Sequence, residues 1–579
     1  MDEKLEYQKY QKLKRFYQEK VSRIASVRLV AFIVMIVSFI LKYYYYPLFF
    51  GILFVSFLIL FVILVFIHDK YYKKYDYYAS YVEILNTYLD RENGKWKEFL
   101  DKGEDFLDDK SLIFSDLDVL GNGSLFQFLS ICKTLGGRER LFYKLSNIEL
   151  DSKTLKLEQD AILELTNKIQ FDVEFQIAIR YYDQKKIHLS HDFSYLDRGV
   201  GSRKRDFFIG IVASCCCWLF FLLGCFGFLS FSYFYGMFFF NYMLSFMYSY
   251  IFKDDFSCLE KTVYNYGKLS GVMDCILKEK FSSLKLKNIW NRIEKGKIDI
   301  IRLSKIDSMN SLRNNLLANF FFNGFFCFNL ILLYRFSLFL DSSLGDLKDS
   351  ICDIEQLEAM VSLASLGIVK NHKCVPSYSE EVTLNFLDLK HPLLDEDVCV
   401  GNDFEGKDGV YIITGSNMGG KSTLLRTIGI NLILMNAGCY VCAKKFQSSY
   451  FKLFTSISVR DDIKKGISTF YGELLRIQEM VQYVDKGNML VLIDEIFKGT
   501  NYQDRIYGAR EVIKKFHTKR TIAFITTHDF ELCEEKRIHN YHVKEDYQGD
   551  KIIFDYKLRK GKCVSTNAKY LMRKLHIIK

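Results

Sequence analysis

The sequence predicts a multidomain chain of two fold classes: a helical part with transmembrane helices, then a C-terminal α/β domain with a mainly parallel sheet. The first reason is length, because 579 residues exceed what one hydrophobic core normally organises. The second is composition, which is 49% hydrophobic yet 26% charged and so indicates strongly apolar segments beside soluble regions. The third is that short apolar strands alternate with helical stretches from Pro376 onward, as in a parallel sheet.

The first apolar pair lies near the N-terminus, at about 24–41 and 47–67. Each run approaches the roughly 20 residues that a helix needs to cross a bilayer. The link from Tyr43 to Tyr46 suits the aromatic belt at a membrane interface. A long charged stretch precedes the pair and no small-residue cleavage site follows it, so we interpret it as a helical hairpin and not as a cleavable signal.

A second apolar pair lies between Phe207 and Phe252, where 46 residues include no charged side chain. A break near 229–231 divides it into two spans, which brings the predicted contact with the lipid bilayer to about four transmembrane helices. The alternative for either pair is a buried hairpin of a soluble protein. A further apolar stretch, Leu316 to Leu340, is interrupted by asparagines and an arginine, so we expect a packed or interfacial helix there.

Basic residues flank both pairs, which predicts a multi-pass protein of the cell membrane with its soluble parts in the cytoplasm. These residues are Lys12, Lys14, Arg15, Lys20, Arg23, Lys70, Lys73, Lys74, Arg203, Lys204 and Arg205. The net charge of +10 by itself selects no partner, because acidic residues lie among the lysines. The predicted regions are 1–75 with the first hairpin, 76–206 as a helical core, 207–252 as the second hairpin, 253–375 as further core and arm, and 376–579 as the α/β domain.

The segment Gly415 to Ser422 fits the phosphate-binding loop pattern, between an apolar strand (410–414) and a helix from Gly420. Glycines let the backbone N–H groups point at phosphates, Lys421 reaches the terminal phosphates, and Ser422 is a ligand for Mg²⁺. The pattern therefore predicts a P-loop (ABC-type) ATPase domain with ATP and Mg²⁺ as cofactors. The predicted nucleotide-binding residues are Gly415, Ser416, Asn417, Met418, Gly419, Gly420, Lys421, Ser422 and Thr423.

Two further strand ends carry candidate catalytic groups. The strand Met489 to Ile493 is followed by Asp494, predicted to orient the Mg²⁺ shell with Ser422, and by Glu495, predicted to position the attacking water. The strand 521–527 is followed by His528, which we expect to sense the terminal phosphate. The alternatives are that two acids simply end a strand and that the histidine is structural.

These motifs resemble a known family. The run Thr414 to Thr423, followed by Leu425-Arg426, closely resembles the phosphate loop of the MutS family of DNA mismatch-repair proteins. The segments Asp494-Glu495-Ile496 and Gly499-Thr500 resemble the residues that follow the second motif of that family. Ser468-Thr469-Phe470 with Glu473 is similar to the segment that reaches the nucleotide of the opposite subunit. The resemblance implies a homodimer in which Ser468 and Thr469 contact nucleotide.

The resemblance extends more weakly upstream and downstream, over about 115–200 and 253–579. The similar segments are Ser124-Leu125-Phe126 and 134–138 in the helical core, His391-Pro392-Leu393 at the start of the ATPase domain, and Tyr556-Lys557-Leu558 with Gly561 and Asn567-Ala568 in the closing segment. The chain also departs from the family. No Phe-x-Glu wedge for reading mismatches occurs in it, and the first apolar hairpin lies where the mismatch-reading domain is expected.

The sequence thus predicts a homodimeric, Mg²⁺-dependent ATPase whose nucleotide state rearranges helical arms. By resemblance, those arms bind double-stranded or branched DNA in mismatch repair or DNA-structure recognition. A different class of function stays open, an ATPase that drives or gates a membrane process without DNA. A scaffold that binds ATP without useful turnover is the third alternative.

Overall fold

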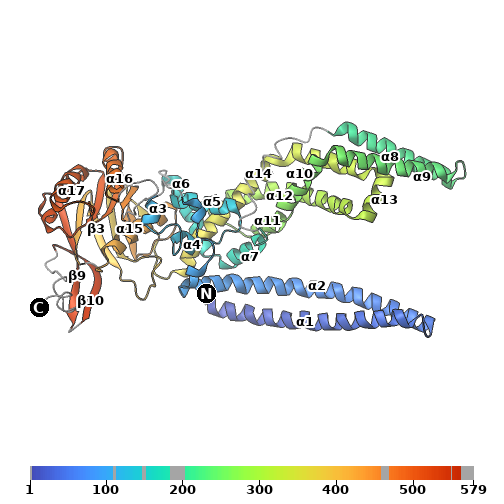
Figure 1. Cartoon of the computed structure of the whole chain (residues 1–579), viewed down its shortest axis with the longest axis horizontal. Coiled ribbons are helices and arrows are strands. Elements are labelled where there is room, and N and C mark those ends of the chain that lie inside the picture. Colours follow the sequence, from blue (N-terminus) through green and yellow to red (C-terminus); the bar gives the residue numbers. More distant parts are fainter. Residues whose placement is uncertain are drawn as a thin grey trace. The chain divides into compact units, whose positions relative to one another are not determined.

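The computed structural model describes residues 3–107, 112–146, 152–182, 203–416, 418–457, 469–548 and 551–562 (Figure 1). The chain divides into two compact units. The first comprises Met1–Trp96 with Ile169–Arg180, and the second comprises Lys97–Lys168 with Tyr181–Lys579.

The first unit is built on a long helical hairpin. Helices α1 (Glu3–Leu41) and α2 (Pro47–Glu92) run side by side, and α7 (Ile169–Ile179) packs against α2 (Figure 1). Pro47 occupies the first turn of α2, where its missing N–H group leaves no helical hydrogen bond unmade. The predicted helices of the first apolar pair are therefore present, and each extends well beyond its apolar run.

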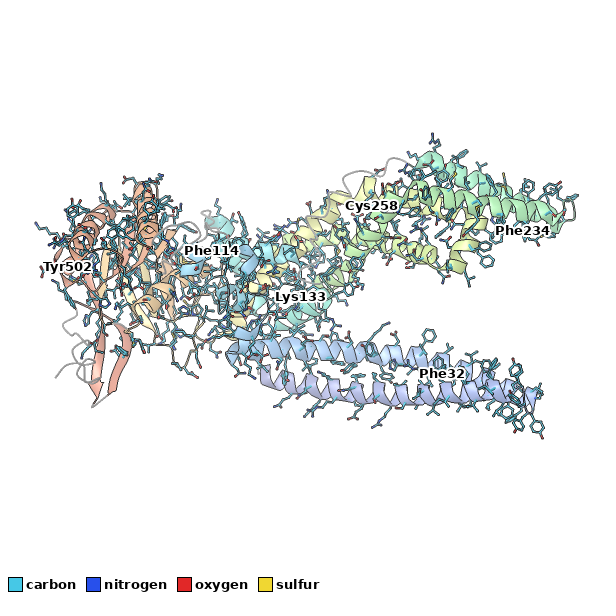
Figure 2. All side chains as sticks on the ribbon, in the orientation of Figure 1. Phe32, Phe114, Lys133, Phe234, Cys258 and Tyr502 are labelled. Carbon is cyan, nitrogen blue, oxygen red and sulfur yellow. The ribbon has the colours of Figure 1, made fainter. Side chains whose placement is uncertain are left out.

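Apolar side chains cover the outside of this hairpin near its tip, and Figure 2 marks Phe32 among them. Three helices in the described part of the chain are long and apolar enough to cross a membrane, and they are α1, α2 and α8 (Lys204–Cys225). Helix α9 (Phe231–Ile251), the second half of the second predicted pair, is not among them. Its tyrosines, serines and Asn241 lower its mean hydropathy, although it carries no charge.

The helical part of the second unit is organised by one long helix, α14, which packs against α12, α5 and α6. A short 3-10 turn, η1 (Lys95–Glu98), joins the two units. The other helices in this part are η2 (Glu104–Phe106), α3 (Leu112–Asp116), α4 (Leu125–Leu129), α5 (Leu135–Ser146), α6 (Ser152–Thr166), α10 (Lys253–Tyr266), α11 (Leu269–Lys278), α12 (Leu284–Asn314), α13 (Leu316–Phe326) and α14 (Phe328–Val369).

The stretch predicted as a single packed or interfacial helix from Leu316 to Leu340 is two helices. Helices α13 and α14 meet at an angle of 88° at Cys327, whose φ of +46° is left-handed. The side chain of Asn241 on α9 supports the bend, because its amide group donates to the carbonyl of Gly324 at 3.0 Å. Together the bent pair is also apolar enough to count as one broken span. Helical periodicity alone does not reveal such a bend.

The C-terminal part carries two sheets. A six-stranded sheet has the order β10-β9-β4-β8-β7-β6, in which all neighbouring pairs are parallel except β10 with β9. A four-stranded sheet has the order β1-β5-β2-β3 and is mainly antiparallel. The strands are β1 (Ser377–Tyr378), β2 (Thr383–Leu389), β3 (Asn402–Lys407), β4 (Gly409–Thr414), β5 (Lys445–Ser448), β6 (Lys452–Ser456), β7 (Met489–Asp494), β8 (Thr521–Thr526), β9 (Ile538–Gln548) and β10 (Lys551–Lys560).

The predicted mainly parallel sheet is confirmed, and its three predicted strands are β4, β7 and β8 within a residue of the expected bounds. Helices α15 (Lys421–Asn436), α16 (Thr469–Tyr483) and α17 (Tyr502–Phe516) and the 3-10 turn η4 (Phe530–Glu534) connect the strands. Helix α15 is almost wholly buried, and it packs against β7 of the sheet and α5 of the helical part. The four-stranded sheet was not predicted.

Candidate functional site

The loop from Gly415 to Gly420 connects the end of β4 to the start of α15. Gly415 has a φ of +147°, and a Cβ atom there would lie 2.4 Å from the Val543 Cγ2 atom of β9. Gly420 has a φ of +86° and forms the N-cap of α15. Only glycine fits both positions without strain, since L-residues avoid this backbone region and the first site has no space for a side chain.

The Lys421 ammonium group is folded back over this loop. Its Nζ atom donates to the carbonyl oxygens of Gly415 and Ser416 at 2.8 and 2.9 Å. Among the described residues, no side chain caps the N-terminus of α15. The amides of the first helical turn and the buried Lys421 ammonium therefore form a positive group of hydrogen-bond donors, the arrangement that binds anions at helix N-termini.

Ser422 and the first acid of β7 lie directly against each other. The Ser422 hydroxyl donates to Asp494 Oδ2 at 2.6 Å, and the Thr526 hydroxyl of β8 donates to Asp494 Oδ1 at 2.5 Å. A carboxylate and a hydroxyl oxygen are the ligand types that Mg²⁺ accepts. The chemistry of this donor set fits that ion.

Glu495 follows in a strained turn, with a φ of +56°. Its N–H group donates to the Thr526 hydroxyl at 3.0 Å, and its carboxylate lies 2.9 Å from Lys498 Nζ. The hydrogen bond from His528, with help from Lys498, lowers the pKa of the Glu495 carboxyl to about 2. Glu495 is consequently ionised at neutral pH.

His528 joins the two halves of the site. Its Nε2 atom lies 3.3 Å from Lys421 Nζ and 3.4 Å from Glu495 Oε1. A neutral imidazole nitrogen either accepts a hydrogen bond from Lys421 or donates one to Glu495. The tautomer of His528 therefore decides which of the two partners Nε2 bonds. The structure thus brings together Lys421, Ser422, Asp494, Glu495 and His528, which the sequence had placed on three separate segments.

Three of the remaining predicted residues, Met418, Gly419 and Thr423, lie in the loop or in the first turn of α15. Met418 is exposed with a φ of +74°, Gly419 lies against Val543, and Thr423 continues α15. Asn417 and Ser468 lie outside the described residues, and Thr469 is described only as the first residue of α16.

Glu473, one turn into α16, is buried within the same subunit. Its Oε1 atom accepts a hydrogen bond from the N–H group of Phe497 at 2.5 Å. Burial raises the pKa of the Glu473 carboxyl. This residue therefore braces the turn that carries Glu495.

Sequence reasoning missed the contribution of β9 and β10. The Ser416 hydroxyl donates to the buried carboxylate of Glu545 at 2.9 Å, and Val543 and Tyr556 pack against the loop glycines. Thr526, the common hydrogen-bond partner of Asp494 and Glu495, lies in the strand predicted at 521–527 but had no predicted role. Nothing local marks Glu545, because it reaches the loop only through strand pairing.

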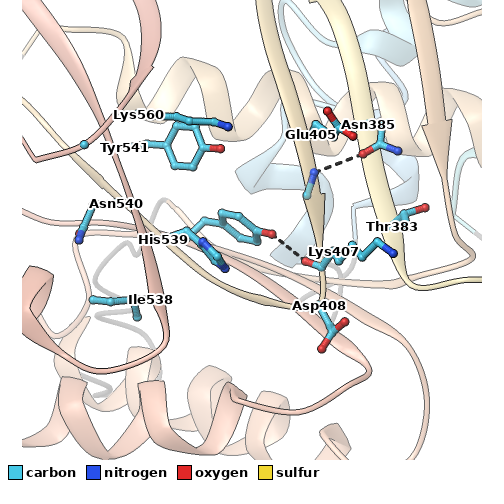
Figure 3. Close-up of a pocket in the computed structure, with 13 residues that line it drawn as sticks. Thr383, Asn385, Glu405, Lys407, Asp408, Ile538, His539, Asn540, Tyr541 and Lys560 are labelled. Carbon is cyan, nitrogen blue, oxygen red and sulfur yellow. Dashed lines mark hydrogen bonds between the residues drawn. The ribbon is translucent and has the colours of Figure 1, made fainter.

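A separate pocket of about 640 Å³ lies at the opposite end of β4, between β3 and the start of β9 (Figure 3). The Tyr411 hydroxyl donates to the Lys407 carbonyl at 2.8 Å, and the His539 ring stacks on Tyr411 at 4.9 Å. Two buried oxygens in its lining, Thr383 Oγ1 and Asn540 Oδ1, find no hydrogen-bond partner among the described residues. The pocket contains none of the predicted site residues.

The region that contains these site residues is similar to a known protein family. Residues 411–571 match the family model described as MutS domain V. This region is therefore similar to MutS domain V, and by that likeness we refer to residues 411–571 as the MutS domain V. The predicted resemblance to the MutS family is confirmed there, whereas the apolar hairpins and most of the helical part lie outside the matched residues.

Several DNA mismatch repair proteins MutS are similar to this part of the chain. The protein of Lysinibacillus sphaericus is 32% identical over 220 residues, which are 36% of this chain and 26% of that protein. The protein of Listeria monocytogenes serotype 4a is 30% identical over 230 residues, covering 38% and 26%. That of Staphylococcus haemolyticus is 34% identical over 221 residues, covering 36% and 25%. The chain spans about a quarter of the length of these relatives, with the MutS domain V as the centre of the likeness.

Proposed function

We propose that this protein is a membrane-anchored, Mg²⁺-dependent ATPase of MutS type that works as a homodimer on DNA. The observation that carries the ATPase part is the convergence of Lys421, Ser422, Asp494 and Glu495 at the carboxyl ends of neighbouring strands. Ligands of open α/β sheets bind at that edge. The match of residues 411–571 to the family model of MutS domain V supports the same proposal.

The proposed roles follow from the donors and acceptors present. Lys421 and the N-terminus of α15 would hold the triphosphate, and Ser422 with Asp494 would hold Mg²⁺, which neutralises phosphate charge when bound. Glu495 is ionised and can accept a hydrogen bond from a water molecule. His528, which contacts both Lys421 and Glu495, is placed to respond to the terminal phosphate.

The test of the site is ATP turnover by the full chain in detergent or lipid nanodiscs. We expect Lys421→Ala and Glu495→Gln each to lower kcat by on the order of a hundredfold or more, because positioning and charge stabilisation supply most of the rate. The matched control is Glu511→Gln, the same chemical change on an exposed residue of α17. Turnover at the unmutated level in both site variants would reject the proposed ATPase.

DNA binding and dimer formation are proposed from the relatives, which are named DNA mismatch repair proteins. In the proposed dimer, Ser468 and Thr469 would face the nucleotide of the opposite subunit. Purified protein should bind duplex, mismatched or branched DNA most tightly at low salt, where phosphate contacts are strongest. Absence of binding to all three substrates at low salt would exclude the DNA role while leaving the ATPase intact.

Membrane anchoring is proposed from α1, α2 and α8, each long and apolar enough to span. With basic residues on their flanks, the MutS domain V would lie in the cytoplasm. We expect the protein to remain with membranes after extraction at alkaline pH. Release into the soluble fraction would remove the anchor from the proposal.

The same helices favour a second candidate, an ATPase that drives or gates a membrane process without DNA. The two candidates differ in what stimulates turnover. The first predicts that DNA raises kcat, and the second predicts that reconstitution into a bilayer raises kcat and that DNA has no effect.

A further inference from the structure

An acidic residue from outside the MutS domain V is built into its core. Asp116, at the end of α3, is fully buried. Its Oδ2 atom accepts from the Thr455 hydroxyl at 2.8 Å, from the N–H group of Ile457 at 3.2 Å and from Arg476 Nη1 at 2.9 Å. The threonine lies 339 residues further along the chain, so the contact joins the helical part to β6 and α16.

These donors offset the cost of burying the Asp116 carboxylate. A charge removed from water is costly unless it is paired and hydrogen-bonded, and an arginine with two further donors meets that need. The cost also makes the arrangement specific, because moving either element would leave a buried charge without its partner. Asp116 therefore fixes where α16 lies against β6.

The position of α16 in turn fixes the turn that carries Glu495. Arg476 lies three residues after Glu473, on the same helix. Glu473 accepts from the N–H group of Phe497, two residues after Glu495, and Phe497 has a φ of +60°. A left-handed residue that is not glycine persists only where its surroundings hold it. Asp116 holds Arg476, and Glu473, three residues earlier on the same helix, holds Phe497, so α16 links the two contacts.

A second acid of the same segment reaches the other half of the site. Asp118, with a φ of +52°, pairs with Arg426 on α15, and the Asp118 Oδ2 and Arg426 Nη1 atoms are 2.8 Å apart. Helix α15 begins at Lys421, so Arg426 is little more than one turn from the residue that reaches the loop. The two acids are separated by Leu117 alone. Asp118 thus contacts α15, which begins with Lys421 and Ser422, and Asp116 contacts α16, which supports the turn that carries Glu495.

We propose that Asp116 and Asp118 are positioning residues of the nucleotide site, Asp116 for Glu495 through Arg476 and Asp118 for Lys421 through Arg426. This inference rests on the proposed ATPase function. It assigns different tasks to the two acids: Asp116 governs the rate of hydrolysis, and Asp118 governs the affinity for nucleotide. A purely structural role would not separate these two quantities.

The experiment compares Asp116→Asn with Asp118→Asn in the full chain, measuring kcat, nucleotide affinity and thermal melting. We expect Asp116→Asn to lower kcat by on the order of tenfold or more, since small misplacements of a reacting group are costly, with nucleotide affinity within about threefold of the unmutated value. We expect Asp118→Asn to weaken nucleotide affinity by about tenfold, with kcat at saturation changed by less than about threefold. Equal changes of both quantities in both variants would overturn the proposal.

The matched control is Asp353→Asn, which removes the buried acid of another ion pair, that of Asp353 with the half-exposed Arg292 between α14 and α12. Below its melting temperature this variant should keep both kcat and affinity. If it loses either as strongly as the two test variants, the effect is general destabilisation and the proposal fails.

If Asp118→Asn fails to fold, the same contact can be tested by exchanging the charges of the partly exposed pair Asp118 and Arg426. Asp118→Arg alone should weaken nucleotide binding, and adding Arg426→Asp should restore it to within about threefold. Absence of rescue in a folded double variant would reject the role of Asp118. For Asp116, Arg476→Gln reports on the same contact from α16 and should reproduce the loss of kcat, and an unchanged kcat would reject that role.

The outcomes separate this inference from the function on which it rests. If Lys421→Ala and Glu495→Gln abolish turnover and the Asp116 and Asp118 variants behave as the unmutated protein, only the positioning roles fail. If Lys421→Ala and Glu495→Gln leave turnover unchanged, the ATPase proposal itself fails and takes the inference with it.

Discussion

The α1–α2 hairpin and the six-stranded sheet of the MutS domain V are both rich in apolar side chains. The sheet buries these side chains, whereas the hairpin exposes many of them. In β7, every residue from Met489 to Ile493 is buried against neighbouring strands and helices. In the apolar part of α2, Leu48, Phe49, Ile59 and Phe66 are exposed. Apolar surface gains about 25 cal/mol for each Å² removed from water, so the sheet buries its own apolar side chains, whereas the hairpin exposes apolar surface that the described residues of its own unit do not cover.

The contrast extends to charged groups. The MutS domain V and the helices around it bury several acids, and two of them, Asp116 and Glu358 of α14, each accept hydrogen bonds from several donors. The apolar halves of α1 and α2 bury no such groups among their described residues. Buried polar contacts specify one arrangement of elements, whereas an apolar surface alone does not.

The largest expected effect comes from making the same substitution, phenylalanine to alanine, in both regions. The Phe524 ring is fully buried on β8, with ring centroids 4.9 Å from Phe404 and 5.3 Å from Tyr411. Phe524→Ala should lower the free energy of unfolding by about 3–5 kcal/mol, because it removes buried surface and leaves a cavity. Phe66→Ala, at 72% exposure, should change it by less than about 0.5 kcal/mol. Denaturant unfolding in detergent checks both, and similar losses would break the comparison.

The next effect tests whether the covering of the hairpin is a bilayer. Ile59 on α2 is 55% exposed, and Ile298 on α12 is 57% exposed. If lipid surrounds α2, Ile59→Arg should disfavour insertion by about 2.5–3.5 kcal/mol. Ile298→Arg is the matched control, with a change within about 0.5 kcal/mol expected for a water-exposed site. The fraction of protein that inserts into membranes measures both, and equal tolerance of the two arginines would argue against a lipid-facing α2.

A third effect concerns the buried charges of the second unit. The Glu358 carboxylate accepts from the N–H groups of Lys133 and Thr134 and from the Thr134 hydroxyl, and burial raises its pKa from 4.5 to about 7. The folded state therefore holds the proton more tightly than the unfolded state. Stability should fall as pH rises from about 4.5 to about 7 and stay low above that window.

The variant Glu358→Gln removes this dependence with a neutral side chain of the same shape. We expect it to raise the free energy of unfolding at pH 8 by about 2–3 kcal/mol and to have little effect at pH 4. Melting curves across this pH range measure the change. A destabilised variant at pH 8 would show that the hydrogen bonds of the charged form outweigh the cost of burying it.

The smallest effect tests a local feature of the helical part. Ser124 is the N-cap of α4, and its hydroxyl accepts from the N–H group of Gln127 at 3.2 Å. Ser124→Ala should cost about 1 kcal/mol, the usual loss for a helix N-cap. Ser230→Ala, at the N-cap of α9, makes the same change in an exposed position and should cost less. Chemical denaturation compares the two.

The sequence by itself determined three strands of the parallel sheet, β4, β7 and β8, where the glycine loop lies between β4 and α15, and that Asp494 and Glu495 follow an apolar strand. These features depend on neighbours within a few residues, such as a β-strand's apolar run or the backbone freedom of Gly415 and Gly420. The tertiary structure decided the rest. The bend at Cys327, the contact of Glu545 with Ser416 and the burial of Asp116 beside Arg476 arise between residues far apart in the chain, and only packing brings such groups together.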